Sequence, residues 1–206
     1  MSLFVTFEGV EGSGKTTQVA LLADHLEKQG RTVVTTREPG GTKETREIRR
    51  MLSDPDNPLE RTAELLLFLA DRAQHVASVL RPALKRGDVV LCDRYSDSTM
   101  AYQGYGRCHN LDRVRELNQW ASLDLVPDLT IWIDCDVKTG LRRAIKKTGG
   151  PSDRFEAESL EFHEHVRAGF VELHRSNPDR IVRIDGSLEL EDITAMVIAE
   201  VEQRLS

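Results

Sequence analysis

A glycine-rich fingerprint near the start of the chain constrains the fold more than any other stretch. It has the spacing G-x-x-x-x-G-K-[ST] and consists of Gly9, Val10, Glu11, Gly12, Ser13, Gly14, Lys15 and Thr16, with Thr17 after it. An apolar run at 3–7 precedes the fingerprint, and a segment with apolar residues on one helical face follows it. Strand, glycine loop and helix form the context in which this fingerprint is a phosphate-binding P-loop.

The fingerprint predicts how a nucleoside triphosphate is held. The glycines let backbone N–H groups point at phosphate oxygens, and the helix N-terminus adds its positive end. Lys15 is predicted to reach the β- and γ-phosphates, and the Thr16 hydroxyl to lie on Mg²⁺. The alternative is a tight glycine turn that happens to precede a helix. The presence of every fixed element in its proper context argues against that alternative.

The composition fits one soluble domain that spans residues 1–206. The chain has 39% hydrophobic and 30% charged residues, which is ordinary for a globular protein, and its net charge is −6. An acidic chain argues against a nucleic acid polymer as partner but allows a small anionic ligand. No apolar run approaches the length of a membrane span. Three scattered cysteines and no signal peptide predict a reducing cytoplasm.

Short apolar or β-branched runs predict five strands, at residues 3–8, 32–36, 89–92, 129–134 and 181–184. Four of these runs are continuous rather than alternating, as expected for strands buried on both faces of a sheet. Helical patterns separate them. This β-α alternation predicts an α/β fold of three layers, a five-stranded parallel sheet with helices on both faces. We expect ligands at the carboxyl ends of the strands, where polar and glycine-rich residues gather.

A cluster of cations lies at about 142–154. It consists of Arg142, Arg143, Lys146, Lys147 and Arg154. Within it, the Thr-Gly-Gly-Pro-Ser stretch at 148–152 cannot stay helical. A basic, glycine-broken segment on a P-loop protein is typical of a lid over phosphates. The alternative is a solvated helix end whose cations complement the helix dipole.

Asp93 and Arg94 narrow the chemistry. A GTPase would need Asn-Lys-x-Asp and Asp-x-x-Gly strings, and neither occurs in this chain. In a motor or transport ATPase, several apolar residues precede a terminal Asp or Asp-Glu. Asp93 does follow such a run, but Arg94 comes directly after it. An arginine beside the metal-side carboxylate suits transfer between two phosphates, because it can hold the acceptor phosphate against the donor.

Segments along nearly the whole chain resemble the bacterial thymidylate kinases, a family of P-loop nucleoside monophosphate kinases, and keep the family's order. They are residues 7–17, 36–42, 67–72, 93–99, 101–104, 127–130 and 153–155. The resemblance implies the P-loop kinase fold with a lid, and Mg²⁺ as cofactor. It implies transfer of the γ-phosphoryl group of ATP to dTMP, giving dTDP and ADP, in dTTP synthesis. It also implies a homodimer, for which the apolar stretch at 65–69 is a candidate interface, although core burial explains that stretch equally well.

The resemblance assigns the thymine base to Phe68, which stacks on the ring, and to Arg72, which hydrogen-bonds the base edge. A nucleobase needs an aromatic face and an edge reader, and these two residues share one face of a helix at i and i+4. From the residues alone, Phe68 would instead be core packing within an apolar run. The corresponding alternative for Arg72 is an exposed helix charge.

The sugar and phosphate of dTMP are assigned in the same way. The resemblance places Glu11 at the 3′-hydroxyl, and Arg94 with the 37–40 turn, which contains Glu38 and Pro39, at the 5′-phosphate. It implies that three further side chains line the base and sugar pocket and that the region around one of them disfavours a ribose. These side chains are Ser98, Tyr102 and Gln103, and the region is that of Tyr102, for which a packed aromatic is the alternative.

The predicted mechanism follows from charge. The attacking phosphate oxygen is already anionic near neutral pH, so alignment and charge neutralisation suffice and no strong base is needed. Lys15, Mg²⁺, Arg94 and the lid cations would neutralise the moving phosphoryl group. Thr16 and Asp93 are the predicted metal-side residues, Asp93 directly or through water.

Which lid cation is catalytic stays open at this point. Lys147 stands where many members of the family have an arginine, and a lysine cannot clamp a phosphate bidentately. Arg143 and Arg154 are the other candidates, and Arg143 is also a candidate to stack on adenine. His163 and His165 do not predict a metal site, because residues at i and i+2 point away from each other on a helix.

Three rival functions remain from sequence. A deoxynucleoside kinase would use Glu38 as a base on a 5′-hydroxyl. Adenylate- and guanylate-type kinases are compatible with the fold. A nucleotide-gated binding module would belong to another class, and the missing switch and base-reader strings weigh against it.

Overall fold

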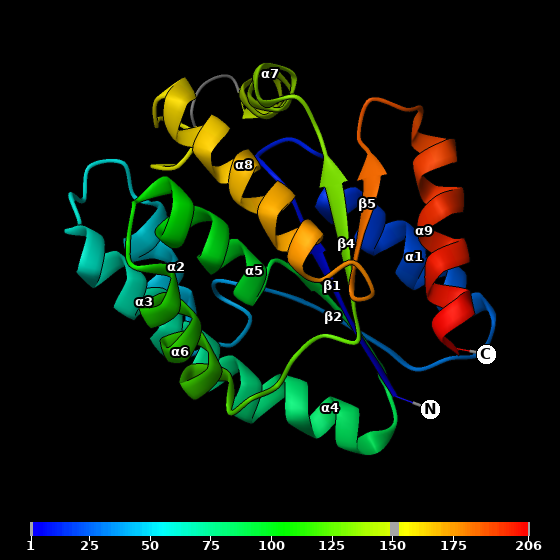
Figure 1. The fold of residues 1–206 in the computed structure, drawn as a ribbon. Coiled ribbons are helices and arrows are strands. Elements are labelled where there is room, and N and C mark those ends of the chain that lie inside the picture. The colour runs from blue at the N-terminus through cyan, green and yellow to red at the C-terminus, as the bar shows by residue number, and fades with distance from the viewer. Residues whose placement is uncertain (1, 149–152, 206) are drawn as a thin grey trace.

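The computed structural model describes residues 2–148 and 153–205 of the chain. Its centre is a sheet of five strands in the order β2-β3-β1-β4-β5, with every neighbouring pair parallel (Figure 1). The strands are β1 (Leu3–Glu8), β2 (Val33–Arg37), β3 (Val89–Asp93), β4 (Leu129–Asp134) and β5 (Ile181–Asp185). The predicted fold is therefore confirmed. Strands β1 and β4 have the predicted bounds. Strands β2, β3 and β5 each end one residue later than predicted, because Arg37 pairs with Asp93 and Asp134 with Asp185, and β2 also begins one residue later.

Helices cover both faces of this sheet. One face packs against α1 (Lys15–Lys28) and α9 (Leu190–Leu205). The other face packs against two wide π-helical segments and helices of the middle of the chain. These are α3 (Arg61–His75), η1 (Val76–Leu80), α4 (Arg81–Arg86), α5 (Ser96–Thr99), η2 (Met100–Gly106) and α8 (Leu160–Ser176). The remaining helices are α2 (Arg46–Ser53), α6 (Leu111–Ser122) and α7 (Val137–Thr148).

The burial of the strands follows their place in the sheet. Every residue of β1 and of β4 is buried, as is β3 up to Cys92, because helices lie on both sides of them. The edge strands β2 and β5 are only partly buried. Continuous apolar runs in the middle and mixed runs at the edges are the pattern that this layering demands.

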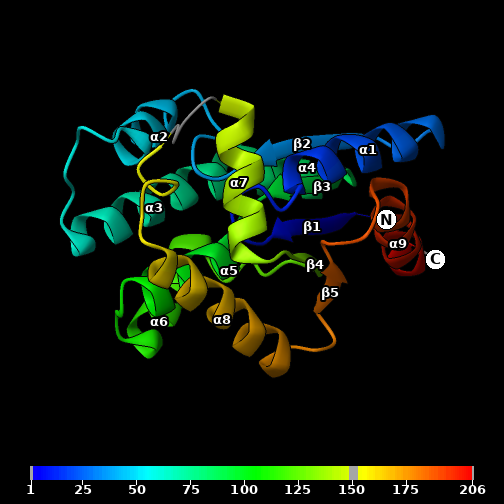
Figure 2. The ribbon, with the colours of Figure 1, turned by 90° about the horizontal axis from the view of Figure 1, so that it is seen from above.

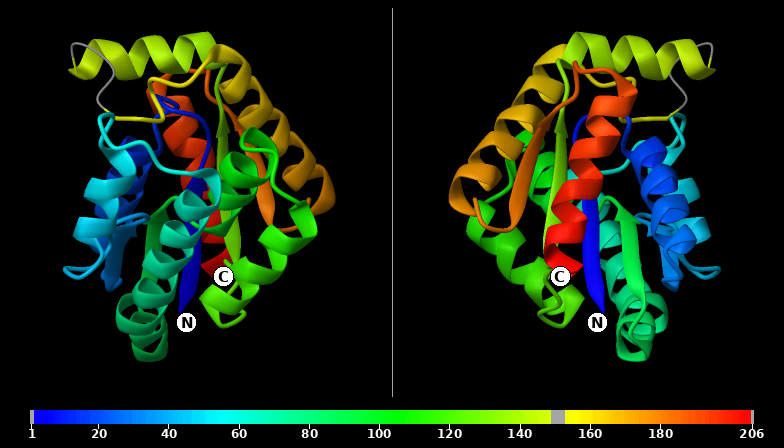
Figure 3. Two further views of the ribbon diagram at one scale, coloured as in Figure 1. Left: turned by 90° about the vertical axis from the view of Figure 1, so that its left-hand side faces the viewer. Right: turned by 90° about the vertical axis from the view of Figure 1, so that its right-hand side faces the viewer.

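The carboxyl ends of the strands and α7 lie at the same end of the molecule. Figures 2 and 3 show α7 crossing this end, whereas both termini lie at the opposite end. The register places Phe7, Arg37 and Asp93 level with one another, so the loops that follow β1, β2 and β3 emerge together. This convergence brings the P-loop close to the segments that follow β2 and β3, at the carboxyl ends of the strands where ligands of such sheets bind.

The predicted lid segment lies partly outside the described residues. Helix α7 ends at Thr148, at the predicted break, and residues 149–152 and the side chain of Lys147 are not among those described. Within the described chain, Cys92, Cys108 and Cys135 are free thiols, two of them buried. No helix in that part of the chain is both long and apolar enough to cross a membrane.

Candidate active site

A cleft of about 470 Å³ opens at the carboxyl ends of the strands. It brings together most of the predicted site residues, including Lys15, Phe68 and Arg72. The predicted residues that line it are Glu11, Gly12, Gly14, Lys15, Thr16, Thr17, Glu38, Pro39, Phe68, Arg72, Asp93, Arg94, Ser98, Tyr102, Gln103 and Arg143. Gly9, Val10 and Ser13 belong to the loop but lie behind this surface, where the carbonyls of Gly9 and Val10 accept hydrogen bonds from Lys15.

The P-loop is held in shape by its own lysine and by α7. Lys15 Nζ lies 3.0 Å from the Gly9 carbonyl oxygen, 2.8 Å from that of Val10 and 3.3 Å from Ser13 Oγ. Burial, together with the nearby Arg94, lowers the pKa of Lys15 to about 8. Gly12 has a φ of 66°, and a Cβ there would come within 2.0 Å of the Gly140 carbonyl oxygen on α7. The loop therefore needs glycine at this point both for its backbone and for the close approach of α7.

Thr16 and Asp93 bring two oxygen ligands together beside the P-loop. The Thr16 hydroxyl donates to Asp93 Oδ2 over 2.5 Å. No group of three or more His, Cys, Asp or Glu side chains within the described residues is placed to hold a metal. Mg²⁺ prefers oxygen ligands, keeps several waters, and is usually held by one or two protein groups plus substrate phosphates. The pair thus fits Mg²⁺ bound with a nucleotide, and does not resemble an all-protein metal cage.

Arg94 is fixed between the P-loop and η2. Its φ of 70° lies in the left-handed region, which is rare for a non-glycine residue and is strained. Its guanidinium donates to the Gly9 carbonyl, to Ser98 Oγ and to Glu11 Oε1, and it lies 4.9 Å from the centre of the Tyr102 ring. Burial would lower the pKa of Arg94, but Tyr102, Glu11 and other acidic neighbours hold it above its usual value.

Besides Glu11, a second carboxyl group lies near Arg94, that of Glu8 at the end of β1. It accepts hydrogen bonds from the Tyr95 backbone N–H at 2.8 Å and from Ser98 Oγ at 2.5 Å. Burial, reinforced by the neighbouring Asp97, raises the pKa of Glu8 to about 8. Ser98, predicted to line the base and sugar pocket, thus also links Glu8 to the Arg94 guanidinium.

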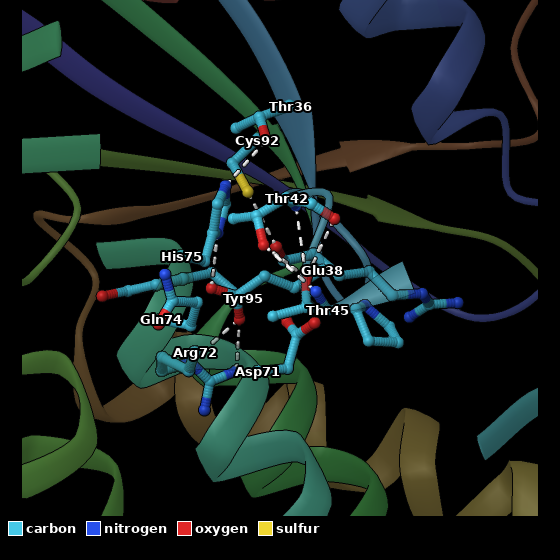
Figure 4. A network of polar contacts seen from close by, with 12 residues as sticks. Thr36, Glu38, Thr42, Thr45, Asp71, Arg72, Gln74, His75, Cys92 and Tyr95 are labelled. Carbon is cyan, nitrogen blue, oxygen red and sulfur yellow. Dashed lines mark hydrogen bonds and ion pairs between the residues drawn. The ribbon is translucent and has the colours of Figure 1, made fainter. Parts of the chain in front are cut away.

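Glu38 joins the β2 loop to α3 through two buried partners (Figure 4). Arg72 Nε and Nη2 donate to Glu38 Oε2 at 3.0 and 2.8 Å. His75 Nδ1 lies 2.9 Å from Glu38 Oε1, and its Nε2 lies 2.7 Å from Thr36 Oγ1. Figure 4 shows Arg72 and His75 reaching the glutamate from the same helix. The carboxylate is therefore occupied at both oxygens.

Arg72 is not the exposed helix charge that the alternative required, because its side chain is 1% exposed. Its Nη1 donates to Thr99 Oγ1 and to Asn118 Oδ1, in addition to the two bonds to Glu38. The guanidinium also lies 5.0 Å from the centre of the Tyr95 ring. The side chain reaches the cleft with its plane already fixed by these partners.

Phe68 is half-buried at the wall of the cleft, and its ring lies 5.9 Å from that of Phe155. Its neighbours in sequence behave differently, since Leu65 and Leu69 are 4% and 5% exposed and belong to a core cluster. Leu66 is 53% exposed on the outer surface. Residues of one apolar run thus lie in the core, at the cleft and on the outer surface. The sequence alone did not predict which residue lies in which of these places.

Three side chains contact the carboxylate of Glu11. Its Oε1 accepts from Tyr102 Oη at 2.5 Å and from Arg94 Nη2 at 3.1 Å, and its Oε2 lies 3.2 Å from His163 Nδ1. Burial alone would raise the pKa of Glu11, but these partners and Lys15 lower it to about 2. His163 was considered from sequence only as a metal ligand, and its position here was missed because nothing local links it to residue 11.

The predicted lid cations do not act alike. The exposed Arg143 lines the cleft, and its Nη1 donates to the Gly186 carbonyl at 3.2 Å. Arg154, expected among the catalytic cations, points elsewhere, pairing with Glu64 at 2.8 Å and donating to the Leu52 carbonyl at 3.2 Å. The buried Glu64 draws it there and also accepts from Gln103 Nε2 at 2.9 Å. Lys147 cannot be placed, since its side chain lies outside the described residues.

Two arginines of the cleft were not named individually as site residues from sequence, although Arg37 begins the 37–40 turn that the resemblance assigned to the 5′-phosphate. Arg37, at the end of β2, and Arg49, on α2, both line the cleft, and Arg49 Nη1 donates to the Pro39 carbonyl at 2.9 Å. Burial, with Arg37 nearby, lowers the pKa of Arg49. The place of Arg37 directly before Glu38 was a usable signal. For Arg49 there was none, because only the packing of α2 brings it to the cleft.

The chain is similar to known proteins in both sequence and structure. The family model described as thymidylate kinase matches residues 7–197. The thymidylate kinase of Pelobacter propionicus is 51% identical over 98% of this chain and 95% of that protein. The thymidylate kinase of Gloeobacter violaceus is 49% identical over 97% and 94%. A crystal structure of thymidylate kinase from Ehrlichia chaffeensis superposes with a TM-score of 0.80, at 35% identity and over 98% of each chain.

Proposed function

The chain belongs to the thymidylate kinase family and transfers the γ-phosphoryl group of ATP to dTMP, giving dTDP and ADP, and we propose that the cleft performs this transfer with the residues described above. The observation that carries the proposal is that Lys15, Arg94, Phe68 and Arg72 line one continuous cleft. Two nucleotides can therefore meet end to end in it.

The donor nucleotide binds at the P-loop end. Backbone amides of residues 9–17 and the N-terminus of α1 hold its phosphates, and Lys15 exchanges its carbonyl partners for the β- and γ-phosphates. Mg²⁺ would be held at Thr16 and Asp93, where it supplies charge neutralisation for the phosphates. Arg143 is the lid cation whose described side chain lines the cleft, so we place it on ATP.

The acceptor nucleotide binds at the other end. Phe68 stacks on the thymine ring and Arg72 hydrogen-bonds the base edge, since its guanidinium reaches the cleft wall in a fixed orientation. Tyr102 and Gln103 bound the sugar pocket, and Glu11 accepts the 3′-hydroxyl. Arg94 and the loop with Glu38 and Pro39 hold the 5′-phosphate, with Arg37 and Arg49 adding positive charge nearby.

Catalysis in this arrangement is alignment and electrostatics. The attacking phosphate oxygen carries its own charge, so the protein has to bring it in line with the γ-phosphorus and neutralise the moving group. Arg94 lies between the two nucleotides and already has a fixed side chain. A rigid cation stabilises the developing charge without reorganising during the reaction.

A deoxynucleoside kinase would need Glu38 as a base, and its contacts argue against that role. Arg72 donates twice to one carboxylate oxygen and His75 faces the other. A carboxylate held in this way is a poor proton acceptor for a third group.

We also place the enzyme in the cytoplasm as a homodimer. Large apolar side chains stand on α3, on α6 and on the segment after α6, where Leu66, Trp120, Leu123 and Val126 are 53%, 77%, 58% and 58% exposed. Helices α3 and α6 pack against each other, so this face is a coherent candidate interface. Light scattering after gel filtration tests this interface. The unchanged protein is expected to have the mass of a dimer, and Trp120→Glu the mass of a monomer. A monomeric unchanged protein, or a dimeric Trp120→Glu variant, would contradict the proposal.

The activity test is ADP release from ATP and Mg²⁺ with dTMP, thymidine, AMP, GMP or water as acceptor. Rapid turnover is expected with dTMP alone, and Lys15→Met supplies the background. Turnover with thymidine but not dTMP would move the chain to the nucleoside kinases. Release of ADP with water alone would contradict the acceptor site.

A further inference from the structure

A buried histidine next to the P-loop carboxylate has no role in the mechanism above. His163, on α8, is 0% exposed, and its Nδ1 lies 3.2 Å from Glu11 Oε2. Neither of its ring nitrogens has an aligned hydrogen-bond partner among the described residues. Burying a polar group without a good partner costs about 1–3 kcal/mol, so such a group in a native protein calls for an explanation.

The two oxygens of Glu11 have different surroundings. Oε1 meets Arg94 Nη2 and Tyr102 Oη, and both of these side chains line the cleft. Oε2 is buried, and it also lacks an aligned hydrogen-bond partner in the described structure. His163 therefore stands behind the inner oxygen, while the outer oxygen lies on the side of the cleft.

We propose that His163 is a positioning residue for acceptor recognition, which anchors the inner oxygen of Glu11 so that the outer oxygen can accept the 3′-hydroxyl of the bound nucleoside monophosphate. The inference rests on the proposed function, in which Glu11 meets that hydroxyl. An ionised carboxylate only accepts hydrogen bonds, so His163 presents Nδ1–H to it. Catalytic hydrogen bonds are often poorly aligned in the free enzyme and tighten in the complex, as this contact would.

The origin of the participating groups makes the arrangement specific. Glu11 comes from the P-loop, Arg94 from the end of β3, Tyr102 from η2 and His163 from α8. Helix α8 packs directly on η2, so the histidine and the tyrosine are held in one rigid unit. The acceptor selected by this unit is a nucleoside monophosphate with a free 3′-hydroxyl, and a 3′-deoxy nucleotide loses the contact.

The competing explanation is that His163 only fills space. Its ring lies 5.4 Å from that of Phe162, in an edge-on arrangement, within a region of aromatic side chains. If filling space were its whole role, phenylalanine would replace it without kinetic consequence.

The experiment pairs two variants with two acceptors. His163→Phe keeps an aromatic ring at this position and removes both ring nitrogens. His163→Asn keeps a hydrogen-bond donor near the position of Nδ1. Each is assayed with dTMP and with 2′,3′-dideoxythymidine monophosphate, and thermal unfolding verifies that each is folded. His163→Phe is expected to raise the KM for dTMP about tenfold, leave the KM for ATP unchanged, and behave like the unchanged enzyme with the dideoxy acceptor. His163→Asn should recover most of the loss.

Two results overturn the inference. One is unchanged kinetics of His163→Phe with dTMP, and the other is an equal loss with both acceptors. Glu11→Ala, assayed with the same acceptors, separates this inference from the proposed function. If Glu11→Ala raises the KM for dTMP but not for the dideoxy acceptor, and His163→Phe changes neither, only the role of His163 is removed. A Glu11→Ala penalty that is equal for both acceptors removes the proposed contact to the 3′-hydroxyl, and the inference with it.

Discussion

The donor end and the acceptor end of the cleft are built in different ways. The donor end is one contiguous loop, residues 9–17, whose lysine is held by carbonyls of the same loop. At the proposed acceptor end, side chains from separate elements hold one another. Arg72 on α3 holds Glu38 after β2, and Arg94 after β3 holds Glu11, a side chain that the P-loop contributes to this end. In the proposed complex, guanidinium groups rather than main-chain amides bind the acceptor phosphate.

This difference determines how each end tolerates change. Loop amides are present whatever the side chains are, so the donor end depends on glycines and on one lysine. The charged acceptor side chains Arg72, Glu38, Arg94 and Glu11 are largely buried and paired, so removing one of them leaves its partner uncompensated. We therefore expect acceptor-end variants to lose more than variants of the exposed donor-end cations.

Arg94→Ala is expected to have the largest effect. Arg94 is the cation shared by the two ends, and loss of one preorganised charge donor lowers turnover by about 10²–10³-fold. ATP binding should stay nearly intact, because the loop amides and Lys15 remain. Steady-state kcat and equilibrium titration with a fluorescent ATP analogue measure the two quantities. Turnover equal to that of the unchanged enzyme would remove Arg94 from the mechanism.

Arg72→Ala is expected to affect stability as well as acceptor binding. It leaves Glu38, which is 4% exposed, without its charged partner, and breaking a buried pair in this way costs about 3–5 kcal/mol. Urea unfolding followed by circular dichroism gives the free energy, and the KM for dTMP should rise in parallel. Arg72→Lys is the control, since it keeps the charge and loses the fork. A stable Arg72→Ala protein would mean that water enters and solvates Glu38.

Phe68→Ala should act on the acceptor alone. Loss of stacking on one base raises the KM for dTMP roughly tenfold. The stability should change less than in Leu65→Ala, the matched variant from the core side of the same helix, because Phe68 is only half-buried. An increase confined to the KM for ATP would mean that Phe68 contacts the donor nucleotide and would contradict its stacking on the acceptor base.

Arg143→Ala is expected to give the smallest effect. The side chain is exposed, and its Nη1 donates to the Gly186 carbonyl and, over 3.8 Å, to Cys135 Sγ. Exposed charges contribute little in water. We expect a change of no more than about fivefold in the KM for ATP, with kcat nearly constant. A fall in kcat comparable to that of Arg94→Ala would show that the donor end also depends on a single side chain, and the comparison would fail.

Local features of the sequence were enough to predict the sheet and the glycine loop between β1 and α1. The strands were found within one residue, because buried central strands require continuous apolar runs. The P-loop was found because its spacing is a property of one contiguous segment. The predicted roles of Phe68 and Arg72 came from a resemblance, and their spacing on a helix was compatible with either core or cleft.

The remaining decisions belong to the tertiary structure. The packing of α8 on η2 brings His163 to Glu11, over a separation in sequence that no local pattern spans. The buried Glu64 turns Arg154 away from the cleft, and the position of α2 adds Arg49 to it. A charged side chain is oriented by the countercharge it finds after folding. The sequence by itself therefore determined which phosphate-binding loop and which sheet this chain forms, and only the fold decided which side chains line the cleft.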